Sequence, residues 1–322
     1  MRIHLPNSAR LVNLGGFLRS FDPADDCSLE FSMNDRWVAV HPAVLAFSAA
    51  VADRVSSRGG AHSGTVHKIG SLPYLIRMGL FDYVKLDPGQ RIHEHEAAGR
   101  FIPIQRIRTN DDLSRFIVDM IPLLHAAPED VEPIRYVISE LVRSVLEHSL
   151  SGGGALLAAQ YFRNSATLAL GVCDAGVGVR ATLERFHTVP THWEALVQAL
   201  RPGVSGASPR LGGNAYNAGA GLFFTKSIAC ASRNYFVLYS GDAMFKLKPL
   251  PQDRPIQLFA NPARDHHTKE VDLPEWGGTL VGIDVSLGDT TTFGALMNLI
   301  RSVFGETMRA ERKKKIVQPR FT

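Results

Sequence analysis

The sequence predicts an α/β protein with two domains. Its 322 residues exceed the usual size of one domain, and 45% hydrophobic with 20% charged residues is the composition of an ordinary globular protein. Segments with strand and helix patterns alternate along the chain, which is typical of α/β and α+β architectures. We expect a leader at residues 1–27, a small α/β domain at 28–98, a larger domain at 99–290, and a C-terminal helix with a basic tail at 291–322.

Charge and cysteine content narrow the class of protein. A net charge of +4 is too small for a protein that coats polyanions as a whole. The three cysteines form no C-x-x-C pair, which fits a reducing compartment and gives no metal pattern. No run reaches the ~18 apolar residues of a membrane span, and the N-terminus lacks an uninterrupted apolar core like that of a signal peptide. We therefore expect a cytoplasmic protein without membrane association.

The small domain begins with residues 28–33, which alternate like a strand. Pro42 suits the first turn of a helix, and the Ala-rich pattern after it stops at Gly59-Gly60. The other elements that we expect are strands at 37–40, 64–69 and 83–86, and a helix at 72–81.

The larger domain opens with residues 99–104, an extended linker or edge strand because Pro103 removes a ladder donor. An amphipathic helix at 111–124 follows, which Pro122 bends or cuts short. A second helix is capped by Asp130 and ends before Ser151. After it we expect strands at 155–162, 167–173, 235–239, 243–247 and 278–285, and helices at 178–186, 193–200, 222–231 and 293–312.

The helix after Asp130 has polar residues on one face and is followed by a strand that ends in an acid. Its apolar residues recur at helical spacing, while Glu140, Ser144 and His148 recur every four residues and so share the opposite face. The apolar strand at 168–173 ends in Asp174-Ala-Gly-Val-Gly. An acid at a strand end followed by two close glycines suits a nucleotide pocket.

These segments resemble the GHKL ATPases, a group that includes gyrase-type topoisomerases and histidine kinases. The N box of the family resembles residues 140–148, the first glycine box 174–178, the second 219–222, and the terminal G-T box Gly278-Thr279. Four boxes in the family order form a more specific pattern than any one of them. The resemblance covers about residues 99–285 and implies a Bergerat-type two-layer α/β sandwich with a mixed sheet, binding ATP and Mg²⁺.

The resemblance assigns the adenine side of the pocket to the first glycine box and the G-T box. Asp174 would accept a hydrogen bond from the exocyclic amine of adenine, and Thr279 would bridge the same site through its hydroxyl or a water. Gly176 and Gly178 would let the backbone pass close to the nucleotide without a Cβ in the way.

The phosphate side falls on the second glycine box. Gly219, Gly221 and Leu222 precede or open a helix whose free N–H groups can hold phosphate oxygens. The glycine-rich stretch at 203–218 would be the ATP lid, and Asn217 near its end is included in the nucleotide site.

Four further side chains receive roles with differing support. Glu140 would be the general base for the attacking water. Ser144 would be a metal ligand, where the family has asparagine, so slow hydrolysis is expected. His148 either faces the pocket or is a structural histidine. Lys226 either approaches the phosphates or is an ordinary solvated lysine.

The order of elements at 28–98 resembles a STAS-like domain, the fold of anti-sigma antagonists. Where such antagonists carry an acceptor serine, this chain has Val40-His41-Pro42-Ala43, so we expect an interaction or dimerisation module. The leading functional expectation is slow Mg²⁺-dependent ATP hydrolysis with lid closure as a switch for a regulatory protein partner. Homodimer formation stays open.

Two alternative functions are carried forward. One is a serine/threonine protein kinase of the anti-sigma type. The other is a nucleic-acid-associated module that acts through the basic segment at 309–315 and Arg320. For that segment a solvated helix end, whose cations complement the helix dipole, is the favoured interpretation.

Overall fold

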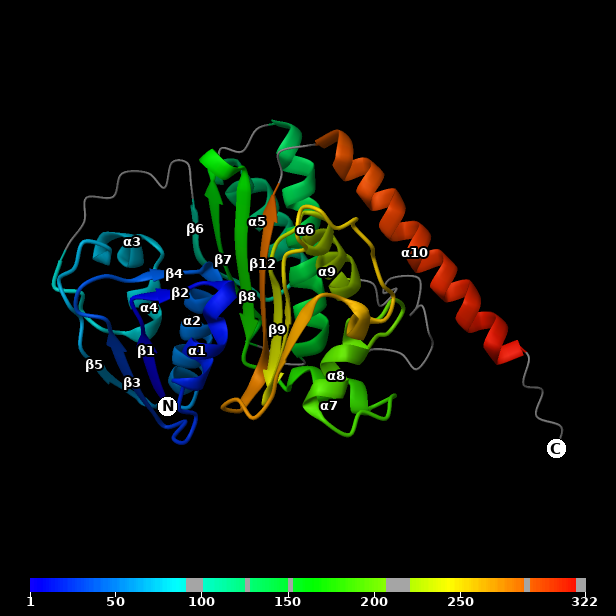
Figure 1. The fold of residues 1–322 in the computed structure, drawn as a ribbon. Coiled ribbons are helices and arrows are strands. Elements are labelled where there is room, and N and C mark those ends of the chain that lie inside the picture. The colour runs from blue at the N-terminus through cyan, green and yellow to red at the C-terminus, as the bar shows by residue number, and fades with distance from the viewer. Residues whose placement is uncertain (91–100, 125–127, 150–152, 207–220, 287–289, 317–322) are drawn as a thin grey trace.

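A seven-stranded antiparallel sheet forms the centre of the molecule (Figure 1). The computed structural model describes residues 1–90, 101–124, 128–149, 153–206, 221–286 and 290–316. The strands follow the order β11-β10-β9-β12-β8-β7-β6, and each neighbouring pair is antiparallel. The protein is therefore mixed α/β with a large antiparallel sheet, and the prediction of a mixed sheet is wrong for the described strands. Their bounds are β6 Phe101–Ile107, β7 Ala155–Phe162, β8 Thr167–Asp174, β9 Phe236–Gly241, β10 Ala243–Leu247, β11 His267–Glu270 and β12 Trp276–Ser286.

Helices cover one face of this sheet. The longest that packs on it is α6, whose apolar stripe, including Val137, Ile138 and Leu141, is fully buried against the sheet. Helix α5 ends at Met120, where the short 3₁₀ helix η2 (Ile121–Leu124) takes in Pro122, as the missing N–H of proline predicts. The helices on this side are α5 Asn110–Met120, α6 Pro128–Ser149, α7 Gly178–Glu184, α8 His192–Ala199, α9 Gly221–Ala231 and α10 Thr290–Ile316.

The N-terminal segment forms a second, smaller sheet that is parallel. Its strands are β1 (Arg2–Leu5), β3 (Ser28–Met33) and β5 (Ala61–Gly64), in the order β1-β3-β5. The other N-terminal elements are the paired strands β2 Ser8–Ala9 and β4 Ala39–Val40, and the helices α1 Leu14–Arg19, α2 Pro42–Ser57, α3 Leu72–Arg77 and α4 Leu80–Val84. Residues 1–27, expected as a leader, thus supply β1, β2 and α1.

Helix α2 lies between the two sheets and covers the second face of the large one (Figure 1). Its start comes very close to Gly171 of β8 and Gly282 of β12, which are paired across the strands. A Cβ at Gly171 would lie 2.2 Å from the backbone of Ala43. His41 caps the helix, and its Nε2 lies 3.1 Å from Oδ1 of Asp284 on β12. These two neighbouring glycines therefore create the flat surface against which α2 packs.

Burial on this second face joins residues from both predicted domains in one core. Val44, Phe47 and Val51 of α2 pack with Tyr239 and Leu280 of the large sheet. Phe47 also makes ring contacts with Tyr239 at 6.0 Å. The arrangement of two separate domains is therefore not confirmed.

Most predicted elements appear near their expected positions, but two strand predictions are wrong. Residues 83–86 were expected as a strand, whereas Tyr83 and Val84 end the helix α4. Val84 is fully buried there, and a short apolar run does not distinguish a strand from a buried helix. The strand expected at 64–69 lies earlier, since β5 ends at Gly64. The extended segment with Pro103 is the edge strand β6.

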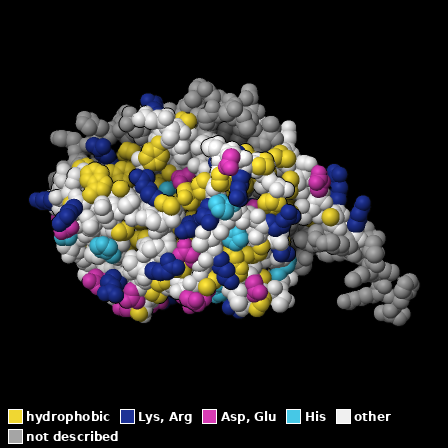
Figure 2. All heavy atoms as spheres, in the orientation of Figure 1, with side chains coloured by type: hydrophobic (Ala, Val, Ile, Leu, Met, Phe, Trp, Pro, Cys, Tyr) yellow, Lys and Arg dark blue, Asp and Glu magenta, His cyan; other side chains and the backbone are white. Residues whose placement is uncertain are grey.

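The surface carries charges of both signs. Figure 2 shows basic and acidic side chains interspersed over the face that it displays. Among the described residues, no helix is both long enough and apolar enough to cross a bilayer.

Candidate functional site

Asp174 and Thr279 face each other across the neighbouring strands β8 and β12. Leu170 and Val172, two alternate residues of β8, point into the core beneath the helices. Asp174 continues this alternation, so its side chain points to the same side of the sheet. Both side chains are almost completely buried, at 1% exposed. The pair therefore lies at the strand ends, on the sheet face that α6 covers.

The carboxylate of Asp174 accepts hydrogen bonds only from neutral backbone donors among the described residues. Gly176 donates its N–H to Oδ1 at 2.7 Å, and Thr279 donates its N–H to Oδ2 at 3.2 Å. The Oγ1 atom of Thr279 is buried and has no hydrogen-bond partner in the described part of the chain. A carboxylate without a cationic partner thus lies beside an unsatisfied hydroxyl, which is costly unless something else satisfies it.

Burial raises the pKa of Asp174 to about 7, because the charged form loses its hydration. The N–H groups of Gly176 and Thr279 act in the opposite direction, since they stabilise the carboxylate. The side chain of Thr279 lowers the pKa as well because it lies close to Asp174, although its Oγ1 makes no hydrogen bond of regular geometry. A pKa near neutrality is unusual for aspartate and is often found at functional sites.

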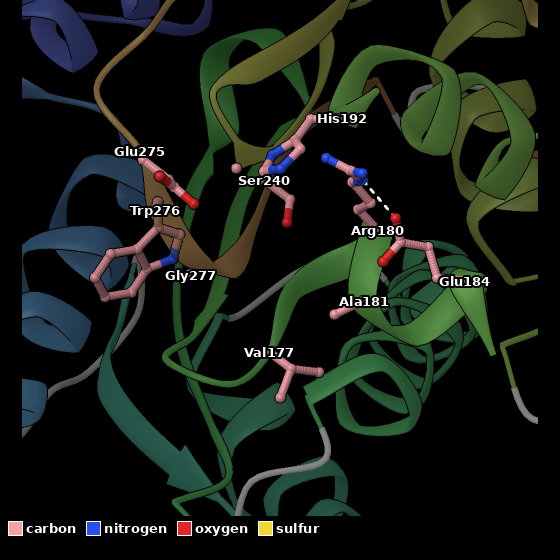
Figure 3. Close-up of a pocket in the computed structure, with 10 residues that line it drawn as sticks. Val177, Arg180, Ala181, Glu184, His192, Ser240, Glu275, Trp276 and Gly277 are labelled. Carbon is pink, nitrogen blue, oxygen red and sulfur yellow. Dashed lines mark hydrogen bonds and ion pairs between the residues drawn. The ribbon is translucent and has the colours of Figure 1, made fainter. Parts of the chain in front are cut away.

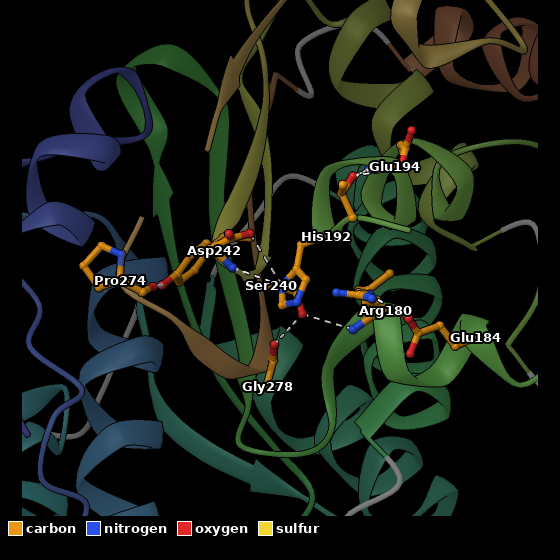
Figure 4. Close-up of polar contacts among 11 residues, drawn as sticks. Arg180, Glu184, His192, Glu194, Ser240, Asp242, Pro274 and Gly278 are labelled. Atoms are coloured by element: carbon orange, nitrogen blue, oxygen red, sulfur yellow. Dashed lines mark hydrogen bonds and ion pairs between the residues drawn. The ribbon is translucent and has the colours of Figure 1, made fainter. Parts of the chain in front are cut away.

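The bend between β8 and α7 and the β-bulge between Trp276 and Thr279 of β12, here called the two turns, hold the ends of β8 and β12 together. Gly178 has a φ of +79°, and a Cβ there would lie 2.6 Å from Oγ of Ser240. A Cβ at Gly278 would lie 1.9 Å from the carbonyl oxygen of Asp174. Ser240 of β9 connects the turns, because its Oγ accepts from the N–H of Val179 at 3.0 Å and donates to the carbonyl of Gly278 at 2.7 Å (Figure 4). Gly178 therefore requires glycine for both backbone conformation and space, and Gly278 requires it for space.

A cavity of about 360 Å³ borders these turns. It lies between α7, the start of α8 and the beginning of β12, with Val177, Arg180, His192 and Glu275 among its lining residues (Figure 3). Arg180 is paired with Glu184 at 2.7 Å, so its charge is already balanced. Asp174 is not among the lining residues. The cavity therefore adjoins the turn without containing the buried carboxylate.

Glu140 lies on α6, one turn after a contact with α9. Tyr136, one turn earlier on the same stripe, has its ring 6.4 Å from the ring of Phe224 in α9. The side chain of Glu140 is 23% exposed and pairs with Arg143 at 2.9 Å. The carboxylate is thus accessible to water near the helix that begins at Gly221.

The second glycine box lies partly within the described chain. Gly221 is the first residue of α9, and Leu222 is buried in the core. Lys226 does not point to solvent, since its Nζ lies 2.5 Å from Oδ2 of Asp265 and 3.2 Å from the carbonyl of Phe259. Both charged side chains are 1% exposed. Neither expected role of Lys226, a phosphate contact or a solvated lysine, describes this buried pair.

Several predicted site residues fall outside the described part. Asn217 and Gly219 belong to residues 207–220, and the side chains of Ser144 and His148 are likewise outside it, although their backbone lies in α6. The structure brings together Asp174, Gly176, Gly178 and Thr279, four of the residues that the resemblance assigns to the nucleotide site.

The sequence reasoning missed two residues that support this site. Ser240 joins the turns, and the Nε1–H of Trp276 donates to the carbonyl of Asp174 at 3.1 Å. Ser240 had one signal, a hydroxyl within the apolar run of β9. Comparison of the chain with protein-family models and with curated proteins found no significant match.

Proposed function

We propose that this protein binds ATP at the strand ends that hold Asp174 and Thr279, and hydrolyses it slowly with Mg²⁺. The observation that supports this proposal best is the buried carboxylate of Asp174, which has only neutral donors, beside the unsatisfied hydroxyl of Thr279. Such a pair needs a ligand that supplies a donor to the carboxylate and a partner to the hydroxyl.

Adenine meets both requirements. Its exocyclic amine donates a hydrogen bond that Asp174 can accept, and its neighbouring ring nitrogen can accept from the hydroxyl of Thr279. Guanine carries a carbonyl where adenine carries the amine, and a carbonyl facing a buried carboxylate leaves both acceptors unpaired. The chemistry of this pair therefore favours adenine over guanine.

The positions of α6 and α9 support the remaining roles of the proposal. ATP, when bound, supplies the γ-phosphoryl group that is transferred to water. Glu140 would orient that water and accept its proton. The N–H groups at the start of α9, where Gly221 lies, would hold phosphate oxygens. The Mg²⁺ role of Ser144 rests on the sequence resemblance alone.

The biological output that we propose is a conformational switch read by a regulatory protein partner in the cytoplasm. Lid closure on ATP would expose or cover the surface that this partner recognises. Incubation with γ-labelled ATP and candidate partners separates this proposal from a protein kinase. Free labelled phosphate is expected for the ATPase, and label on a protein would favour the kinase.

Calorimetric titration with ATP and GTP tests the nucleotide assignment. We expect ATP to bind at least about tenfold more tightly, the ratio that one lost hydrogen bond to a charged group produces. Equal affinity would show that Asp174 does not recognise the base.

Turnover measurements test the role of Glu140 separately. Glu140→Ala should lower the rate about 100-fold or more while ATP still binds. Glu306→Ala is the matched control, because it removes an exposed helix glutamate of α10, where Ser302 is the hydrogen-bond partner. Unchanged turnover in Glu140→Ala would remove the assigned base.

A further inference from the structure

A second cavity lies at the C-terminal end of α9, away from its first residue. It has a volume of about 440 Å³, opens to solvent, and lies between Cys230 of α9 and the segment 250–266. Leu250 and Phe259 give it apolar walls, and Arg254, Arg264 and His266 are also lining residues. A volume of this size, with apolar walls and a few polar groups, suits a small organic ligand.

The charge of this cavity is positive. Arg254 and Arg264 have no ion pair to any residue that the structure describes. Asp265 is the acid among the described lining residues, and Lys226 already neutralises it at 2.5 Å within a buried pair. Two guanidinium groups therefore remain available for an anion.

Internal hydrogen bonds hold the frame of the cavity in place. Arg233 donates hydrogen bonds to the carbonyls of Leu250, Pro251 and Arg254, which fixes the start of the segment. At the other end, the Nδ1–H of His266 donates to the carbonyl of Pro249 at 3.2 Å. Because the segment is already ordered, a ligand would not need to supply the free energy of ordering it.

The ring of Phe259 and the guanidinium of Arg264 indicate how a ligand would lie in the cavity. The guanidinium of Arg264 lies 4.4 Å from the ring centre of Phe259, so the arginine is partly oriented by stacking. A stacked guanidinium keeps its edge N–H groups free to bind a carboxylate or phosphate. The apolar part of the ligand would then contact Leu250 and Phe259.

We propose that this cavity is a second binding site, separate from the nucleotide site, for a small organic acid. The ligand would carry a carboxylate or phosphate on an apolar group, with the anion held by Arg254 and Arg264. Nothing in this proposal requires that ATP binds at Asp174.

Calorimetric titration with phenyl phosphate and phenylacetate tests the site, because these probes share a ring and differ in the anion. All titrations are made without nucleotide, first with the wild type and then with Asp174→Asn. We expect one or both probes to bind, and inorganic phosphate to bind more weakly because it lacks the ring. Binding that is lost in Asp174→Asn would place the probe at the nucleotide site and overturn the proposal.

The double variant Arg254→Gln/Arg264→Gln should weaken probe binding about tenfold or more. Arg185→Gln is the matched control, since Arg185 is an arginine that lies over the ring of Phe186 in the same way, at 5.6 Å. An unchanged thermal unfolding temperature would show that the double variant is folded. Equal binding by the double variant and the wild type, or no binding of either probe to the wild type, would refute the site.

Discussion

Asp174 and Asp265 are both buried carboxylates, yet their surroundings differ in kind. Asp174 accepts from two backbone N–H groups and lies beside an unsatisfied hydroxyl, whereas Asp265 is paired with the ammonium of Lys226. Burial raises the pKa of both, and Lys226 opposes this rise only for Asp265. The comparison teaches that burial alone does not identify a binding carboxylate. The absence of a cation among the described neighbours, together with an orphan polar atom, is the more informative sign.

Removing the lysine of the paired site should have the largest effect. Lys226→Met leaves Asp265 charged and buried, which typically costs about 3–5 kcal/mol of the free energy of unfolding. The double variant Lys226→Met/Asp265→Leu should recover most of this loss, because no buried charge remains. Urea denaturation measures both. If the single variant were as stable as the wild type, the pair would not be buried as described.

Asp174, which has no cationic partner among the described residues, should instead affect how the stability of the protein depends on pH. In the folded protein the pKa of Asp174 is about 7, against an ordinary value of 3.8 for an aspartate in water. Between these values the folded state holds more protons, so stability falls as the pH rises from about 4 to about 7. The total change is on the order of 4 kcal/mol. It should be absent from Asp174→Asn, and parallel curves for the two proteins would contradict the raised pKa.

A smaller effect is expected at the turn beside Asp174. Gly178→Ala places a Cβ at a φ of +79° and 2.6 Å from Oγ of Ser240, which should cost about 1–3 kcal/mol. Gly294→Ala is the control, because a Cβ there meets nothing within 4 Å. If both substitutions had the same effect on urea denaturation, the turn would not be sterically constrained.

The smallest effect on stability is expected from replacing Ser240, which links the two turns. Ser240→Ala leaves the N–H of Val179 and the carbonyl of Gly278 without this hydroxyl partner, at a cost of about 1–2 kcal/mol. Ser302→Ala removes an exposed hydroxyl bonded to Glu306 and should change stability by less than about 0.5 kcal/mol. Equal losses in the two variants would show that Ser240 contributes no more than a surface serine.

Local patterns in the sequence were sufficient to predict much of the fold and the part of the candidate site around Asp174. The apolar run that ends at Asp174 and the glycines after it identified β8 and its turn, because these features are consecutive in the chain. The packing of α2 against Gly171 and Gly282 was not predictable, since helical periodicity does not say which surface a helix meets. Lys226 was misjudged for the same reason, because its partner Asp265 lies 39 residues away.

The parallel strand β1 was also missed, although its pairing with β3 is regular. Four residues with mixed polarity, Arg2–Leu5, give too little alternation to predict a strand, and the pairing is decided by the distant β3. Sequence reasoning thus found the elements whose signals are local and missed those that depend on tertiary contacts.

The most direct test of the central claim is the affinity of a non-hydrolysable ATP analogue for the wild type and for Asp174→Asn, measured by calorimetry at a pH above 7. The amide keeps the size of the carboxyl group, but it removes the charge that would accept from the adenine amine. We expect binding to weaken about 10- to 100-fold, the loss of one hydrogen bond to a charged acceptor. Equal affinities in the two proteins, both shown to be folded, would contradict the assignment of Asp174 as the adenine-binding residue.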